Sequence, residues 1–187
     1  MKRNSLFLMM ISFAFIYSVS GIAQEKEKPQ GKVVTVKWYS FEDAYNMNKK
    51  KPKKIFIDVY TDWCGWCKKM DAETFANPVI AKYMNEHFYC VKFNAERKDT
   101  IRLDGQVFVN PNPGSSRSTH RLAVALLKGN LSYPSYVILS EKSQNITNIS
   151  GYRPAQQFEK TISFYGSDAY LKTPEDEFNA NFKGEVK

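Results

Sequence analysis

The stretch "FIDVYTDWCGWCKKM", residues 56–70, decides the fold because it joins a strand to a helix through a pair of cysteines. After Lys54 the chain is almost continuously apolar up to residue 60, which is typical of a strand buried on both faces of a parallel sheet. Asp58 interrupts this strand in its middle. Apolar residues then recur at helical spacing across residues 64–75. This order places Cys64 at the start of a helix.

The Cys64-x-x-Cys67 motif suits redox chemistry. Unpaired backbone N–H groups and the helix dipole favour a thiolate at a helix N-terminus, and in such motifs the thiol pKa falls from about 8.5 to about 3.5–7.5. Cys67 lies one turn further on, close enough to form a disulfide and to resolve a mixed disulfide with a substrate. A purely structural disulfide is the alternative. It would close a very short loop and so restrain the unfolded chain little.

A zinc site is a second alternative for the same cysteines. Cys64, Cys67, His87 and Cys90 form two closely spaced pairs at a separation that zinc ligands also show. However, Cys90 falls within "FYCVKF", which reads as a buried strand without a turn or glycine to aim His87 and Cys90 at one point. The N-terminal residues, described below, predict export of the chain, which also favours disulfide chemistry. Cys90 is therefore expected to be a small buried apolar residue, and both His87 and His120 to be structural or exposed.

The remaining chain alternates between strands and helices, which indicates one α/β domain. Ser40 is expected to cap a helix, Asn77-Pro78 to separate two helices, and Asp104-Gly105 to form a hairpin turn. The expected strands cover residues 33–40, 54–60, 88–93, 135–139 and 145–150, and the expected helices cover 41–48, 64–75, 78–87, 122–127 and 154–164.

The chain is expected to divide into a leader at residues 1–23, a linker at 24–31, a domain at 32–166 and a polar, weakly packed tail at 167–187. Lys2 and Arg3 precede an apolar run that is too short to span a bilayer, and small residues end at Ala23. This is the anatomy of a secretory signal peptide cleaved after Ala23. The sequence thus predicts a secreted or periplasmic protein without stable membrane insertion after cleavage.

The chain is basic, with 27 Lys and Arg against 19 Asp and Glu and a formal charge of +8. The densest cluster, "KKKPKK" at residues 49–54, is interpreted as a solvated loop before the buried strand. No basic patch is interleaved with an aromatic platform, so nucleic acid is not an expected partner.

The stretch around the cysteines resembles the active site of the thioredoxin superfamily, and most closely its secreted and periplasmic branch. Asp58 and Lys92 match the buried aspartate and its lysine partner, which the resemblance assigns to proton transfer at the inner cysteine. Pro134 matches the cis-proline that faces the disulfide, and Gly151 matches a glycine of the substrate groove. The resemblance implies a thioredoxin-like fold, in which helices flank a central mixed sheet. An insertion at about residues 97–119 precedes the cis-proline strand.

Two positions depart from the family pattern. Trp66 replaces the proline usual between the cysteines, and Tyr133 replaces the smaller residue usual before the cis-proline. Together with Trp63, these aromatic residues are expected to shape the substrate groove. The insertion is expected to cover or extend that groove.

The predicted function is that of a thiol:disulfide oxidoreductase acting on protein or peptide disulfides outside the cytoplasm, in the direction of reduction. Cys64 attacks, Cys67 resolves, and Asp58 with Lys92 transfers protons. The expected partners are these disulfides and an upstream thiol electron donor, with no cofactor and no metal. The alternatives are a thioredoxin-fold binding or chaperone module with incidental redox activity and, less favoured, a metal-handling protein.

Overall fold

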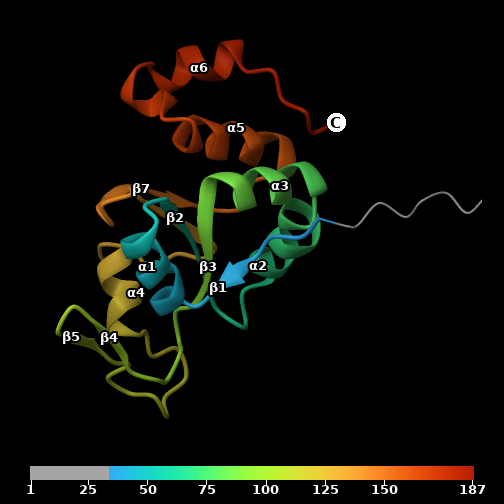
Figure 1. Cartoon of the computed structure of the whole chain (residues 1–187). Helices are drawn as coiled ribbons and strands as arrows, with labels where there is room; N and C mark the ends of the chain where they lie inside the picture. Colours follow the sequence, from blue (N-terminus) through green and yellow to red (C-terminus); the bar gives the residue numbers. More distant parts are fainter. Residues whose placement is uncertain (1–33) are drawn as a thin grey trace, which may run out of the picture. The chain divides into compact units, whose positions relative to one another are not determined.

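A computed structural model describes residues 34–187. The proposed leader, the linker and residues 32–33 lie outside these residues. A five-stranded sheet in the order β1-β3-β2-β6-β7 forms the centre of the fold (Figure 1). Strands β1, β3 and β2 run parallel to one another, whereas β6 runs antiparallel to both of its neighbours, β2 and β7. The predicted mixed sheet flanked by helices is confirmed. None of the described helices is long and apolar enough to cross a membrane.

The order of elements follows the sequence prediction closely. In chain order the elements are β1 Trp38–Tyr39, α1 Phe41–Lys50, β2 Lys54–Tyr60, α2 Gly65–Lys69, a π-helical segment Met70–Phe75, α3 Pro78–His87, β3 Phe88–Asn94, β4 Ile101–Leu103, β5 Gln106–Phe108, α4 Arg121–Leu126, β6 Ser135–Leu139, β7 Asn145–Ser150, α5 Ala155–Gly166, a 3-10 helix Ala169–Leu171 and α6 Glu175–Asn181. The first strand is much shorter than predicted, because only two of its residues pair with β3.

Local signals fix several of these boundaries. The Ser40 hydroxyl accepts the backbone N–H of Asp43 at 3.0 Å and begins α1 as predicted. The Asn77 side chain does the same for α3, where Pro78 occupies the first turn. Asp104 and Gly105 both adopt positive φ values, 47° and 81°, as a two-residue hairpin turn requires.

Two apolar cores lie on opposite faces of the sheet, because side chains alternate along each strand. Ile55, Ile57 and Val59 of β2 contact the core under α1 and α4. Phe56 of β2 faces the other core, which lies under the π-helical segment, α3 and α5. Asp58 follows Phe56 by two residues, so it points to the same face as the helix that begins at the cysteines.

Two predictions outside the site need correction. In the basic cluster at residues 49–54, residues 49–52 are exposed as predicted, but Lys54 is not: its side chain is 3% exposed and pairs with Glu141 at 2.8 Å and Asp168 at 2.7 Å. The tail is not merely polar, because it holds two short helices that pack on α5 (Figure 1). The Phe178 ring lies 5.1 Å from that of Phe164. The spaced aromatic residues of the tail indicate that it packs on the domain, although most of its other residues are polar or charged.

Candidate active site

Cys64 and Cys67 form a disulfide at the beginning of α2, with their Cα atoms 5.3 Å apart. Cys64 is the N-cap of this helix, and its Sγ accepts the backbone N–H of Cys67 at 3.1 Å. The same N–H would stabilise a Cys64 thiolate in the reduced protein. In the disulfide form both cysteines are buried, because Cys64 is 4% exposed and Cys67 is 2% exposed.

Exposed aromatic side chains border the disulfide. Trp63 is 54% exposed and Trp66 is 58% exposed, which is unusual for side chains of this size. Trp66 packs against Tyr152, with ring centroids 5.4 Å apart, and Trp63 packs edge-to-face against Tyr133, with ring centroids 6.0 Å apart. We call the open hollow next to the disulfide the groove. It has a volume of about 340 Å³ and is lined by Trp66, Tyr133, Pro134, Gly151 and Tyr152.

The floor of the groove is formed where β6 begins and β7 ends. The Tyr133–Pro134 peptide bond is cis, as the resemblance implies. Gly151 donates its N–H to the carbonyl of Pro134 at 2.8 Å and has a φ of 91°, a conformation that favours glycine. The structure thus brings Trp66, Tyr133, Pro134 and Gly151 together in one hollow. Their role in binding substrate stays a prediction.

Asp58 lies fully buried and pairs with Lys92 across the β2–β3 register, with Nζ and Oδ2 2.6 Å apart. Its second carboxylate oxygen has no hydrogen-bond partner within the described residues. Loss of hydration raises the pKa of Asp58 to about 6, although the Lys92 charge acts in the opposite direction. A carboxyl group that titrates near neutral pH can accept and return a proton under physiological conditions.

Asp71 is the residue of this network that the sequence analysis missed. Lys92 forms a second, short ion pair with Asp71, and its ammonium lies about 5 Å from the ring centroids of Trp38, Tyr60 and Phe75. Burial lowers the pKa of Lys92, but its two carboxylate partners outweigh this effect and raise it overall. The available signal was spacing: Asp71 follows Cys67 by four residues and therefore lies one turn along the same helical face.

Lys92 and Asp71 reach the surface in a second hollow of about 390 Å³. We call it the rear hollow. Its other lining residues are Thr35, Val36, Trp38, Phe75 and Ala76, and it shares no residue with the groove. Asp58, Lys92 and Asp71 thus form a continuous polar chain from the buried carboxyl group to the rear hollow.

Replacing Asp71 by Asn should lower the pKa of Asp58. The Asp71 charge raises that pKa directly, and its loss leaves Lys92 paired with Asp58 alone. We expect the titration of Asp58 to move to lower pH by a few tenths of a unit or more, followed by carboxyl NMR shifts. Asp43→Asn, an identical charge change at an exposed position of α1, is the control. An equal shift in both variants would mean that Asp71 acts only as a distant charge.

Cys90 does not join the other cysteines. It lies fully buried in the core of the α3 face, and its Sγ contacts the carbonyl of Met84 at 3.7 Å. Burial raises its pKa to about 12, so its thiol is unreactive in the folded protein. His87 instead stacks on Tyr83, and His120 is buried as the cap of α4. Within residues 34–187 no group of three or more His, Cys, Asp and Glu side chains is placed to hold a metal ion.

Alkylation of the reduced protein near pH 7 should therefore label Cys64 first. Cys64 accepts a backbone N–H at the helix start, whereas Cys67 lies inside the helix and Cys90 lies in the core. Peptide mapping after brief treatment with iodoacetamide measures the order. Cys90 should be modified only after denaturant is added. Earlier modification of Cys67 or Cys90 would contradict the assignment of Cys64 as the attacking thiol.

Comparison with known proteins gives partial matches among curated sequences. Spermatogenesis-associated protein 20 from Mus musculus is 36% identical over 75 residues, which make up 40% of this chain and 10% of that protein. The Homo sapiens protein of the same name is 33% identical over the same length. The chain covers about a tenth of these relatives.

Solved structures match the fold over most of the chain. "DsbH Oxidoreductase" has a TM-score of 0.52 at 19% identity and covers 73% of this chain and 92% of its own. A putative disulphide-isomerase from Bacteroides thetaiotaomicron has a TM-score of 0.51 at 20% identity, covering 74% and 98%. A family model described as "Protein of unknown function, DUF255", with the short name Thioredox_DsbH, matches residues 27–167. Because this match spans well over half of the chain, the protein belongs to the thioredoxin-like DsbH (DUF255) family.

Proposed function

We propose that the protein is a thiol:disulfide oxidoreductase that reduces protein or peptide disulfides. One observation carries the proposal: a Cys-x-x-Cys disulfide begins a helix next to an open aromatic groove, and the strand that precedes this helix holds a buried carboxyl group with a raised pKa. A disulfide that only stabilised the fold would require neither the groove nor the carboxyl group. The similarity to "DsbH Oxidoreductase" supports the fold on which this chemistry depends.

The proposed reaction begins with the reduced protein. The Cys64 thiolate attacks one sulfur of a substrate disulfide, forming a mixed disulfide and releasing the other substrate sulfur as a thiolate, which takes up a proton. Cys67 then loses its proton to Asp58 and attacks Cys64 Sγ. This step breaks the mixed disulfide, releases the second substrate sulfur as a thiolate, which takes up a proton, and leaves the Cys64–Cys67 disulfide. Two electrons pass to the substrate, and an external thiol donor must return them.

The equilibrium of the Cys64–Cys67 couple with glutathione tests the proposal. We expect a potential in the range of thioredoxin-like reductases, about −200 to −270 mV, together with catalytic turnover of a protein disulfide such as insulin. A far more negative potential without turnover would indicate a structural disulfide. The exposed aromatic side chains favour one alternative, a binding or chaperone module. If a Cys64→Ser, Cys67→Ser protein kept its binding and biological role, that alternative would replace ours.

We further propose that the protein acts outside the cytoplasm after cleavage of its leader. The support comes from the sequence alone: two basic residues, a short apolar run and small residues ending at Ala23. Mass spectrometry of the protein made in cells is the test. A mature chain beginning at Gln24 in an extracytoplasmic fraction supports the proposal, and an intact N-terminus in the cytoplasm overturns it.

Removal of the aromatic groove walls should change selectivity between disulfides. Trp66 and Tyr133 line the groove, so Trp66→Ala and Tyr133→Ala remove apolar surface that an extended peptide would cover. We expect the rate with a peptide disulfide to fall by about three- to tenfold more than the rate with hydroxyethyl disulfide. Stopped-flow kinetics on both reagents gives this ratio. Equal decreases in the two rates would mean that these side chains only pack in the fold. Faster reaction with both reagents would mean that they restrict access to the disulfide.

A further inference from the structure

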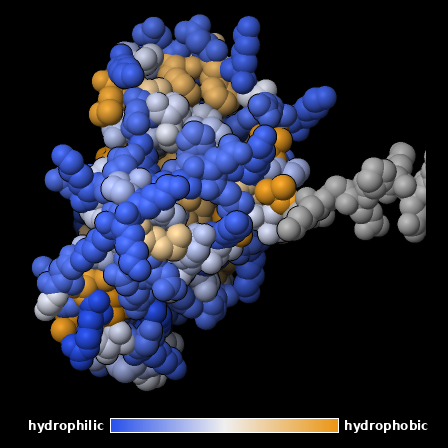
Figure 2. All heavy atoms as spheres, in the orientation of Figure 1, coloured by the Kyte–Doolittle hydropathy of each residue, from blue (hydrophilic) through white to orange (hydrophobic). Residues whose placement is uncertain are grey.

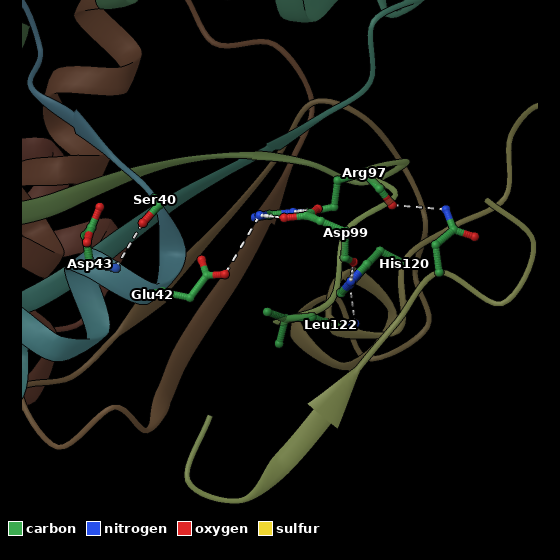
Figure 3. Close-up of polar contacts among 8 residues, drawn as sticks. Ser40, Glu42, Asp43, Arg97, Asp99, His120 and Leu122 are labelled. Carbon is green, nitrogen blue, oxygen red and sulfur yellow. Dashed lines mark hydrogen bonds and ion pairs between the residues drawn. The ribbon is translucent and has the colours of Figure 1, made fainter. Parts of the chain in front are cut away.

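The insertion between β3 and α4 is fastened to the domain at both ends of its hairpin. At the tip, Asp104 accepts short hydrogen bonds from Tyr45 and Lys49 of α1. At the base, Arg97 pairs with Asp99 and lies 3.9 Å from Glu42 of α1 (Figure 3). The hairpin therefore packs beside α1 and does not cover the groove, contrary to one of the two expectations for the insertion. Figure 2 shows an apolar area over β4 and β5. Val107 of β5 is 52% exposed.

The loop after the hairpin, residues 110–119, is held by a separate polar network. The Asn110 amide donates to the carbonyl of Arg97 at 3.2 Å and to that of Ser118 at 2.7 Å. His120 is fully buried: its Nδ1 accepts the N–H of Leu122 at 3.2 Å, and its Nε2 lies 3.1 Å from the carbonyl oxygen of Asp99 (Figure 3). These contacts fix the start and the end of the path that the loop takes across the surface.

This path brings Arg117 to the edge of the active site. The Arg117 guanidinium lies 5.3 Å from the centroid of the Trp63 ring, the residue that precedes Cys64. The indole N–H of Trp63 donates to Glu96 at 2.9 Å, and its ring meets Tyr133 next to Pro134. A continuous set of contacts therefore runs from the insertion to the groove. The insertion extends the wall of the groove without covering it.

Arg117 differs from the cation on the opposite wall. There, Lys69 lies over the rings of Trp66 and Tyr152, at 5.3 and 5.2 Å, but Glu73 compensates its charge at 3.8 Å. Arg117 is exposed, and no described carboxylate lies within ion-pairing distance of it. A guanidinium held over an aromatic ring keeps the N–H donors along its own edge free and can bind a carboxylate with two parallel hydrogen bonds.

We propose that Arg117 binds a carboxylate of the substrate, so that the groove selects disulfides whose cysteine is flanked by Asp or Glu. This inference rests on the proposed function and names its substrate class. The alternative is that Arg117 only covers the Trp63 ring, in which case the charge of the substrate is irrelevant. Two carboxylates lie near Trp63: Asp62 precedes it in the chain, and Glu96 accepts its indole N–H. Without Arg117, these negative charges would repel an acidic substrate segment.

The test uses three peptide disulfides that differ only in the residues flanking the cysteine, which are Asp, Asn or Lys. We expect the reduced protein to react about three- to tenfold faster with the Asp peptide than with the Lys peptide at low salt, as an exposed ion pair allows. The preference should fade near 1 M salt, where the screening length is about 3 Å. The measured quantity is a ratio of rates within one variant, so changes in thiol reactivity cancel.

Arg117→Glu should reverse the order of the three peptides. Arg102→Glu is the matched control, because it makes the same charge change at an exposed position of β4 in the same insertion. It should leave the ratio unchanged. Equal rates for all three peptides, or an equal effect of both variants, would overturn the proposal.

A binding measurement separates this proposal from the redox function. Peptides with Cys replaced by Ser bind without redox chemistry, and their affinities for the oxidised protein should follow the same order. Charge-dependent binding without turnover would reject the oxidoreductase and support the recognition by Arg117. Turnover without any dependence on peptide charge would reject the role of Arg117 and leave the oxidoreductase intact.

Discussion

Cys64→Ser should lower the rate of disulfide exchange by at least about a thousandfold, because it removes the only thiol that begins a helix beside the groove. Cys67→Ser should still attack a substrate but fail to resolve the product. We therefore expect Cys67→Ser to accumulate mixed disulfides with protein substrates, and Cys64→Ser to accumulate none. Non-reducing electrophoresis and mass spectrometry of trapped complexes distinguish the two variants.

Cys90→Ala is the matched control for both cysteine variants. This third cysteine is buried in the core and does not contact the groove, so its removal should preserve trapping and turnover at some cost in stability. Trapping by Cys64→Ser would reverse the roles of the two active-site cysteines. Trapping that disappears in a Cys67→Ser, Cys90→Ala protein would show that Cys90 is the thiol that attacks.

Asp58→Asn should slow the resolution of the mixed disulfide and stabilise the fold at the same time. An amide cannot accept the Cys67 proton. Loss of a general base typically lowers a rate by about a hundredfold or more, and we expect the rate of resolution to fall by at least about tenfold near pH 7. Stability should rise because the substitution removes a carboxylate that is fully buried. Lys92 is not left unpaired, because Asp71 remains its partner.

The stability gain should depend on pH in a defined direction. The pKa of Asp58 is about 6 in the folded protein, so the folded state binds this proton more tightly than the unfolded state does. The contribution of Asp58 to wild-type stability should therefore fall as pH rises from about 4 to about 6, by up to about 3 kcal/mol for the two-unit shift. Asp58→Asn lacks this fall, so its advantage should be small near pH 4 and full above pH 7.

Thermal unfolding of the oxidised proteins at several pH values measures this difference, at about 2–4 °C for each kcal/mol. Glu159→Gln is the control, since it neutralises another buried carboxylate, one that accepts the N–H groups of Glu185 and Val186 far along the tail. It should destabilise the protein and leave the pH profile of exchange unchanged. A pH-independent gain for Asp58→Asn, with normal exchange, would remove Asp58 from the proton pathway.

The sheet and the central residues of the site could be predicted because they obey short-range rules. Alternation along β2 places Asp58 on the face of the cysteine helix, and the parallel register places Lys92 opposite it. The cysteine motif, the two-residue hairpin turn and the helix caps are likewise local patterns. For these features, a few neighbouring residues determine the conformation.

The contact of Arg117 and the burial of Lys54 were missed because they depend on contacts between distant segments. Arg117 has no local feature that indicates its contact with Trp63, because the path of its loop depends on Asn110 and His120. Lys54 reads as part of a solvated basic run, and only its two partners from far along the chain explain its burial. The burial of Cys64 in the disulfide form likewise depends on tertiary packing and not on its position in the helix.

The separation of the groove and the rear hollow has a consequence for large substrates. In the proposed mechanism, a protein bound through a mixed disulfide would cover the groove at the stage when Cys67 must give up its proton. Asp58 connects through Lys92 and Asp71 to the rear hollow, which shares no residue with the groove. If Asp58 accepts the proton as proposed, solvent would still reach it from the rear hollow while the groove is covered, so the bulk of a folded partner would not obstruct its own release.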